Sequence, residues 1–198
     1  ITINITPVND KPVLSALQTP VSIDEEVQYT FTASATDIEN DVLSFSLQGV
    51  VPSGATINPT TGLFSWTPNE TQGPGSYTFQ VRVTDNGTPN EYAEQTITIN
   101  VSEVNVAPVL EPISDKTVAE MTNLTFKATG TDQDRPNNTL TFSLISAPAG
   151  ADINSSTGVF NWTPTEVQGP NAYTFKVRVT DNGTGNLFDE EELTVTVD

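Results

Sequence analysis

Apolar and polar residues alternate in short runs along this chain, and glycine and proline residues separate the runs. In the first half the alternation is clearest at residues 27–33, 43–47, 77–83 and 97–101, and a turn cluster at 58–62 joins two shorter runs. A period of two places the apolar side chains on one face of a β-strand. With an opening strand at about residues 13–23, the pattern predicts a seven-stranded, immunoglobulin-like Greek-key sandwich.

The second half of the chain repeats the first at a shift of 96 residues, the separation of Trp66 from Trp162. The longest repeated block is residues 81–88, which returns at 177–184. We therefore predict an all-β chain of two tandem seven-stranded Greek-key β-sandwiches of the immunoglobulin-like kind. The expected domains are residues 7–104 and 105–198, and the similarity of residues 1–4 to 97–100 predicts that residues 1–6 are the last strand of an upstream repeat.

The charge of the chain limits its partners and its chemistry. The net charge is −18, from 25 acidic and 7 basic residues, which disfavours binding to nucleic acid or to anionic lipid. The absence of Cys and His excludes thiolate and imidazole metal ligands and a Ser-His triad. No apolar run is long enough to cross a membrane, so no membrane insertion is expected in this fragment. Carboxylates at loop tips form no cleft, and the chain is predicted not to be an enzyme.

The predicted topology gathers the acidic residues at the two ends of each sandwich. A divalent cation relieves the repulsion of such clusters, and Ca²⁺ accepts six to eight oxygen ligands with flexible geometry. If the modules stack end to end, the lower end of the first and the upper end of the second supply one set of ligands to a shared Ca²⁺, and the upper end of the first supplies another. The candidate ligands are Asn9, Asp10, Asp37, Glu39, Asp41 and Asp85 for the upper end of the first module, Glu25, Glu26, Glu70 and Glu103 for its lower end, and Asn105, Asp132, Asp134 and Asp181 for the second module.

Several segments resemble the motifs of cadherin repeats. Residues 8–12 and 104–108 are similar to cadherin-type linkers, residues 36–41 and 131–134 to the loop with paired aspartates, and residues 84–87 to the segment with the F-strand aspartate. The resemblance covers essentially the whole chain and is closest to the bacterial and dystroglycan-type cadherin-like repeats. It implies surface or secreted modules, many of which bind calcium and act in adhesion. Val106 stands where the family linker has an acid, which favours one or two ions over three.

These observations leave alternatives open. The leading hypothesis is a cell-surface or secreted adhesion array stiffened by Ca²⁺, whose partners are the other repeats of the same chain and a surface protein or a polysaccharide. The alternative is a carbohydrate-binding or spacer module of an extracellular polysaccharide-degrading enzyme, with Tyr92 and Phe188 as exposed contacts. Trp66 and Trp162 are expected in the core. Each acid alone is also an ordinary turn residue, because Asp and Asn side chains bond their own backbone.

Overall fold

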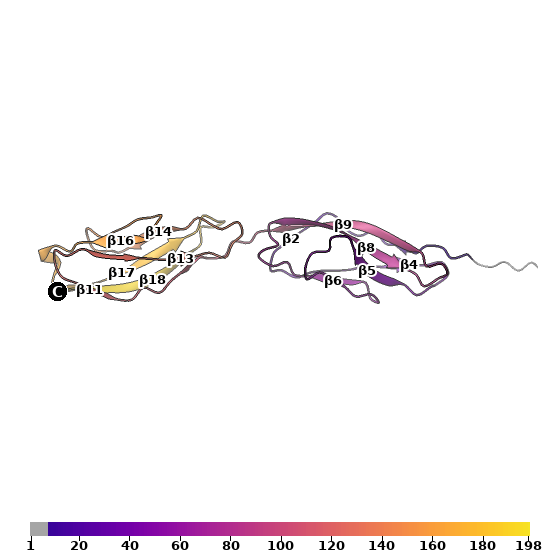
Figure 1. Ribbon diagram of the computed structural model, residues 1–198, viewed down its shortest axis with the longest axis horizontal. Coiled ribbons are helices and arrows are strands. Elements are labelled where there is room, and N and C mark those ends of the chain that lie inside the picture. The colour runs from indigo at the N-terminus through magenta and orange to yellow at the C-terminus, as the bar shows by residue number, and fades with distance from the viewer. Residues whose placement is uncertain (1–7) are drawn as a thin grey trace, which may run out of the picture. The chain divides into compact units, whose positions relative to one another are not determined.

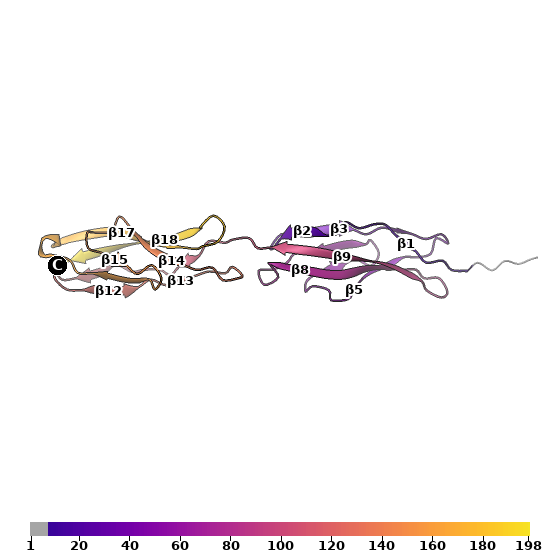
Figure 2. The ribbon, with the colours of Figure 1, turned by 90° about the horizontal axis from the view of Figure 1, so that it is seen from above.

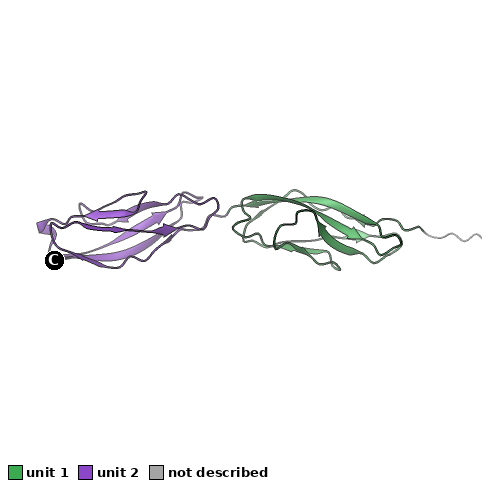
Figure 3. Ribbon diagram, viewed as in Figure 1, with its two compact units in different colours: residues 1–103 green, residues 104–198 purple. Residues whose placement is uncertain are grey.

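The computed structural model describes residues 8–198, and the chain divides into two compact units, residues 1–103 and 104–198 (Figure 3). Each unit is described by itself. The expectation that residues 1–6 form the last strand of an upstream repeat lies outside the described residues. Within the described part, no helix has the length and apolar character needed to cross a membrane.

The regular secondary structure described in unit 1, from residue 8 onward, consists of β-strands, which run along the length of the unit (Figures 1 and 2). Its strands are β1 (Val13–Leu14), β2 (Val21–Asp24), β3 (Tyr29–Thr32), β4 (Ala35–Thr36), β5 (Ser44–Gln48), β6 (Thr56–Ile57), β7 (Leu63–Trp66), β8 (Gly75–Thr84) and β9 (Tyr92–Ser102). They form a four-stranded sheet in the order β2-β9-β8-β5, a three-stranded sheet in the order β3-β7-β6, and the pair β1-β4. The two sheets enclose one core, so the predicted β-sandwich is confirmed.

Unit 2 repeats this arrangement with equivalent strands and one short helix. They are β10 (Val109–Leu110), β11 (Lys116–Val118), β12 (Leu124–Lys127), β13 (Gly130–Thr131), β14 (Thr141–Ile145), β15 (Asp152–Ile153), β16 (Val159–Trp162), the 3-10 helix η1 (Glu166–Gln168), β17 (Asn171–Thr180) and β18 (Phe188–Val197). The sheet orders β11-β18-β17-β14 and β12-β16-β15, with the pair β10-β13, correspond to those of unit 1. The internal repeat in the sequence is therefore a repeat of the fold.

The opening segment differs from the single strand that alternation predicts. It is split into β1, which pairs antiparallel with β4, and β2, which pairs parallel with β9 in the other sheet. The residues between β1 and β2 carry the chain from one sheet to the other, and Pro20 in this stretch has no backbone N–H to give to a ladder. If β1 and β2 are counted as one position, and β3 and β4 as another, unit 1 has the predicted seven.

Large aromatic side chains fill the core of each unit. Trp66 and Trp162 are each 1% exposed, and each indole Nε1–H donates to a backbone carbonyl, that of Ser53 at 3.1 Å and that of Ala149 at 3.2 Å. This hydrogen bond satisfies the one polar atom that burial of a Trp side chain takes away from water. The prediction that both tryptophans are core residues is confirmed, and neither presents a face to a sugar.

Candidate metal-binding poles

Each unit has an N-terminal pole, formed by the residues before its first strand, the loop after β4 or β13 and the loop after β8 or β17. Its C-terminal pole is formed by the turn after β2 or β11, the loop after β7 or β16 and the end of β9 or β18. Acidic side chains in these loops follow strands whose apolar residues face the core, so the strands fix the positions of the loop carboxylates.

Asp85 organises the N-terminal pole of unit 1 from the position after β8. Its side chain is 3% exposed, and its Oδ1 accepts hydrogen bonds from the backbone N–H groups of Gly87 at 3.1 Å and Glu91 at 2.9 Å. Its Oδ2 accepts a hydrogen bond from Asn9 Nδ2 at 3.2 Å, and the same amide donates to the carbonyl of Pro89 at 2.8 Å. The linker asparagine is therefore held against the loop after β8.

Asp37 organises the loop after β4 at the same pole. Its Oδ1 accepts hydrogen bonds from the backbone N–H groups of Glu39 at 3.0 Å and Asp41 at 3.1 Å, which closes the loop around one carboxylate. The Asp10 N–H donates to Glu39 Oε2 at 3.4 Å. Two buried oxygens, Asp37 Oδ2 and Asn9 Oδ1, have no hydrogen-bond donor among the described residues. Orphaned buried acceptors of this kind are the atoms that a cation would satisfy.

The N-terminal pole of unit 2 has the same framework. Asn105 Nδ2 donates to Asp181 Oδ2 at 3.1 Å and to the carbonyl of Thr184 at 3.1 Å, and Asp181 is 4% exposed. Asp132 Oδ1 accepts a hydrogen bond from the Asp134 N–H at 2.9 Å, while the buried Asp132 Oδ2 has no donor in the described part of the chain.

Asp134 is the most deeply buried carboxylate of this pole, at 1% exposed. Burial raises its pKa, and the charges of Asp132 and Asp181 act in the same direction. The backbone N–H of Val106, at 3.1 and 3.2 Å from the two carboxylate oxygens, and the amide of Asn138 oppose that increase. Removal from water, rather than any one neighbouring charge, is therefore the main cost of ionising Asp134.

Three glutamates meet at the C-terminal pole of unit 1. One oxygen each from Glu25, Glu70 and Glu103 can be chosen so that all three lie within 4.8 Å of one another. Glu25 is 1% exposed, and the other two are half-buried. Its side chain points inward because it continues the alternation of β2, in which Val21 and Ile23 are the less exposed residues.

Glu26 has a different role at this pole from the one its sequence position suggests. It lies in the left-handed region with φ 56° and is exposed, and its Oε1 accepts a hydrogen bond from the backbone N–H of Glu70 at 3.1 Å. Glu26 thus orients the Glu70 loop and is not one of the three clustered carboxylates. Of the sequence alternatives Glu25 and Glu26, the geometry favours Glu25 as the ligand.

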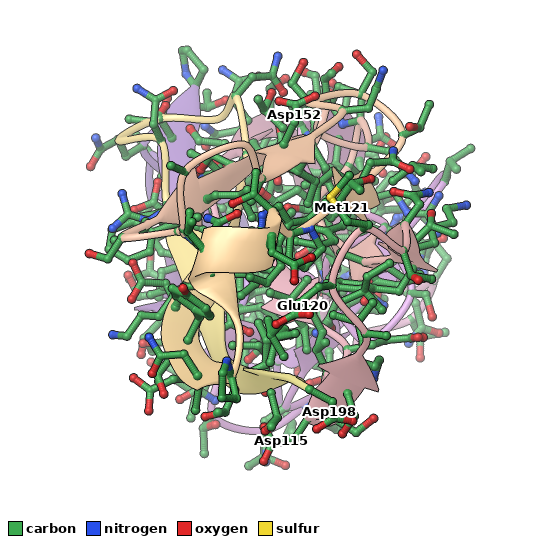
Figure 4. The ribbon with its side chains drawn as sticks, turned by 90° about the vertical axis from the view of Figure 1, so that its left-hand side faces the viewer. Asp115, Glu120, Met121, Asp152 and Asp198 are labelled. Atoms are coloured by element: carbon green, nitrogen blue, oxygen red, sulfur yellow. The ribbon has the colours of Figure 1, made fainter. Side chains whose placement is uncertain are left out.

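The C-terminal pole of unit 2 contains an acidic residue that the sequence reasoning missed. Figure 4 views this end of unit 2, with Glu120 labelled near the centre and Met121 above it. Glu120 corresponds to Glu25, because its N–H donates to Asp198 as that of Glu25 donates to Ser102. The repeat itself was the signal, since residues 25 and 26 align with 120 and 121 once the shift of 95 residues in this region is used.

The structure thus gathers most of the predicted residues within their own units. The predicted residues that it brings together are Asn9 with Asp85, Asp10 with Glu39, Asp37 with Glu39 and Asp41, Glu25 with Glu70 and Glu103, Asn105 with Asp181, and Asp132 with Asp134. The candidate ligand atoms at these poles are carboxylate and amide oxygens, which are the ligands of Ca²⁺ and not of the softer metals.

The exposed aromatics considered for sugar binding are partly covered. Tyr92 is 48% exposed and Phe188 is 50% exposed. The guanidinium carbon of Arg82 lies 4.1 Å from the ring centroid of Tyr92, and that of Arg178 lies 4.1 Å from that of Phe188. The guanidinium group therefore covers one face of each ring and reduces the surface on which a sugar could stack. The alternative hypothesis of a sugar platform is weakened by this geometry.

Solved structures of several cadherins resemble this chain in fold. A fragment of mouse cadherin-23 (EC22-24) is 18% identical with a TM-score of 0.63, and the match covers 96% of this chain and 67% of the cadherin-23 fragment. Drosophila N-cadherin EC1-4 is 17% identical with a TM-score of 0.64, covering 96% and 50%, and protocadherin gamma B2 domains 1-5 is 17% identical with a TM-score of 0.66, covering 96% and 41%. The chain therefore spans half or less of the latter two. At these identities the likeness shows the fold.

The sequence itself identifies the family. No curated protein matches the chain. Residues 11–102 and residues 107–198 each match the family described as "Putative Ig domain", so the match covers nearly all of both units. Domains of this immunoglobulin-like and cadherin-like kind are typically structural modules without catalytic activity. The resemblance to cadherin-like tandem modules inferred from the sequence is confirmed, and the chain belongs to the "Putative Ig domain" family as two tandem copies.

Proposed function

We propose that this chain is a pair of calcium-binding, cadherin-like repeats from an extracellular adhesion protein, in which Ca²⁺ held at the poles stiffens the linker residues. The observation that carries the proposal is the cluster of Glu25, Glu70 and Glu103. Two oxygens bound to one Ca²⁺ lie at most about 5.2 Å apart, which is twice the longest Ca–O bond. The separation of no more than 4.8 Å in the cluster fits one shared ion.

Charge supports the same proposal. Like charges about 4 Å apart repel by roughly 4 kcal/mol at the effective dielectric constant of a protein surface. A divalent cation reverses the sign of that interaction, so it stabilises an arrangement in which carboxylates are close. The net charge of −18 adds to the local repulsion and favours cation uptake.

The residues proposed to hold Ca²⁺ form three sets. They are Glu25, Glu70 and Glu103 at the C-terminal pole of unit 1, Asn9, Asp10, Asp37, Glu39, Asp41 and Asp85 at its N-terminal pole, and Asn105, Asp132, Asp134 and Asp181 at the N-terminal pole of unit 2. The acceptors without donors, Asn9 Oδ1, Asp37 Oδ2 and Asp132 Oδ2, support the second and third sets. The ion supplies positive charge and coordination, and the protein oxygens supply the geometry.

A calcium titration of the purified chain tests the proposal. Extracellular modules commonly bind Ca²⁺ with dissociation constants of about 10⁻⁴ to 10⁻³ M. At ~10 mM Ca²⁺ such affinities stabilise the folded state by about 1.4–2.7 kcal/mol relative to EDTA. Small-angle scattering is expected to give a larger radius of gyration in Ca²⁺ than in EDTA. Unchanged melting and unchanged scattering would contradict the proposal.

Matched variants locate the ion. Glu25→Gln and Glu70→Gln remove charge from the cluster without changing side-chain size, so the calcium-induced shift in melting temperature is expected to decrease. Asp152→Asn is the control, because Asp152 is an exposed residue of β15 on the body of unit 2. If the control loses the same calcium response, the effect is one of net charge and not of the cluster.

A further inference from the structure

The two N-terminal poles differ at one aligned position. The backbone N–H of Val42 donates to Asn86 Oδ1 at 2.7 Å, and that of Thr139 donates to Asn182 Oδ1 at 2.6 Å, so these residues are equivalent. The residue that precedes Val42 is Asp41, and the residue that precedes Thr139 is Asn138. Unit 2 therefore has a neutral amide where unit 1 has a carboxylate.

The Asn138 amide bridges two oxygens that belong to the proposed ligand set of unit 2. Its Nδ2 donates to Asn105 Oδ1 at 2.8 Å and to Asp134 Oδ2 at 2.5 Å. The Val106 N–H donates to the same Asp134 carboxylate. A buried carboxylate and the linker backbone are thus joined by hydrogen bonds alone, and the bond to a charged acceptor is of the stronger kind.

The equivalent atoms of unit 1 have only part of this bridge: the Asp10 N–H donates to Glu39 Oε2 at 3.4 Å, as the Val106 N–H donates to Asp134, but no amide joins the linker asparagine to that carboxylate. Asn9 Oδ1, the counterpart of Asn105 Oδ1, is buried without a donor among the described residues. Asp41 has a carboxylate at the bridging position, and an ionised carboxylate can only accept hydrogen bonds. The Asp41 side chain therefore adds negative charge to the loop that surrounds Asp37, and it can donate to neither Asn9 Oδ1 nor Asp37 Oδ2.

We infer that Asn138 is a built-in substitute for a cation: its amide satisfies Asn105 Oδ1 and orients the Asp134 carboxylate that accepts the Val106 N–H without metal, whereas the pole with Asp41 requires a cation to satisfy Asn9 Oδ1. Asp132 Oδ2 has no donor among the described residues, so the Asn138 amide replaces a cation at Asp134 and Asn105 only. A second part of the inference rests on the proposed function: a divalent ion binds the N-terminal pole of unit 2 more weakly than that of unit 1.

The first part is tested without calcium, on the full chain in EDTA. In Asn138→Ala the Val106 amide loses the ordered carboxylate that accepts its hydrogen, and its hydrogen exchange measured by NMR is expected to accelerate about tenfold. Asn138→Asp places a second carboxylate beside buried Asp134 and is expected to lower the melting temperature further. Asn137→Ala, at the exposed neighbouring residue, is the matched control and is expected to leave both readouts unchanged.

The second part is tested by exchanging the two residues. Asn138→Asp is expected to increase the calcium-induced shift in melting temperature, and Asp41→Asn is expected to decrease it, because each variant gives one pole the charge of the other.

Unchanged Val106 exchange in Asn138→Ala overturns the first part, even if the chain binds calcium. Unchanged calcium shifts in both exchange variants overturn the second. If the melting temperature of the native protein does not change with calcium while Asn138→Ala accelerates the hydrogen exchange of Val106, the first part stands and the proposed function fails.

Discussion

The cores of the two units are nearly superimposable in their contacts, whereas their poles have diverged. Phe64 and Phe79 stack with ring centroids 5.7 Å apart in unit 1, and Phe160 and Phe175 stack at 5.6 Å in unit 2. At the C-terminal poles, by contrast, Glu26 and Met121 occupy the same left-handed position with φ 56° and 60° but have different side chains.

The difference separates what the fold requires from what the poles do. A close-packed core tolerates few changes in volume, and both copies keep the same aromatic residues at their fully buried positions, although Tyr29 at the edge of the core of unit 1 is replaced by Leu124 in unit 2. At the poles the backbone conformation is held by backbone hydrogen bonds, which do not depend on the side chain. The N–H groups of Glu26 and Met121 both donate to a proline carbonyl at 2.8 Å. Side chains at the poles were therefore free to change charge while the backbone stayed the same.

The most severe test of the equivalence of the cores is removal of one tryptophan at a time. Trp66→Ala and Trp162→Ala each delete a fully buried indole and leave a cavity, and each is expected to destabilise its own unit by about 3–5 kcal/mol. Urea unfolding followed by far-UV circular dichroism measures the loss in the mutated unit, and the fluorescence of the remaining tryptophan identifies the transition of the unmutated unit. Losses that differ by more than about 1.5 kcal/mol between the units would contradict the equivalence.

A smaller effect is expected where the linker asparagine crosses the loop after β8 or β17. A Cβ atom at Gly87 would overlap the side chain of Asn9, and one at Gly183 would overlap that of Asn105. Gly87→Ala and Gly183→Ala are therefore each expected to displace the asparagine and cost about 1–3 kcal/mol. Gly87→Ala in an Asn9→Ala background is the control, because the atoms nearest the added Cβ are those of the Asn9 side chain. An equal loss in that background would indicate a backbone effect and no clash.

Alternation along the strands predicted most of this fold and part of the candidate sites. Trp66 and Phe79 follow a strict period of two, and both are buried as expected. The same period could have selected Glu25 over Glu26, because Glu25 has the parity of Ile23. The opening segment was predicted as one strand because local alternation does not specify which sheet a strand joins, and β1 and β2 join different sheets.

Asn138 was missed for a physical reason as well. A search for clustered carboxylates counts charge, and an amide carries none. The loop after β13 is also longer than the loop after β4, so the repeat shift changes between Asp132 and Leu140, and Asn138 no longer aligns with Asp41 at a shift of 96. Its role depends on the directions of two N–H bonds, which spacing in the sequence does not reveal.

The smallest expected effect concerns the outer face of the large sheet in unit 2. Glu190 accepts hydrogen bonds from Arg178 and from Lys176, and these interactions lower its pKa below the ordinary value of 4.5. A carboxyl whose pKa is lower in the folded state stabilises the fold above its unfolded pKa, and this contribution is lost as the pH falls through the folded pKa. Glu190→Gln is therefore expected to cost little, and only above about pH 4.5, in chemical unfolding measured from pH 3 to 7. Glu94→Gln removes the corresponding partner of Arg82 in unit 1 and is the comparison variant for Glu190→Gln. A loss of stability in Glu190→Gln that increases towards low pH would contradict the prediction.

The split opening segment has a mechanical consequence. Within unit 1, β2 runs parallel to the final strand β9 over four residue pairs, from Val21 with Ile99 to Asp24 with Ser102, and β11 runs parallel to β18 over three. A pull on the two ends of a unit draws such strands past each other along their length. The hydrogen bonds of the ladder then share the load in shear and do not open one at a time.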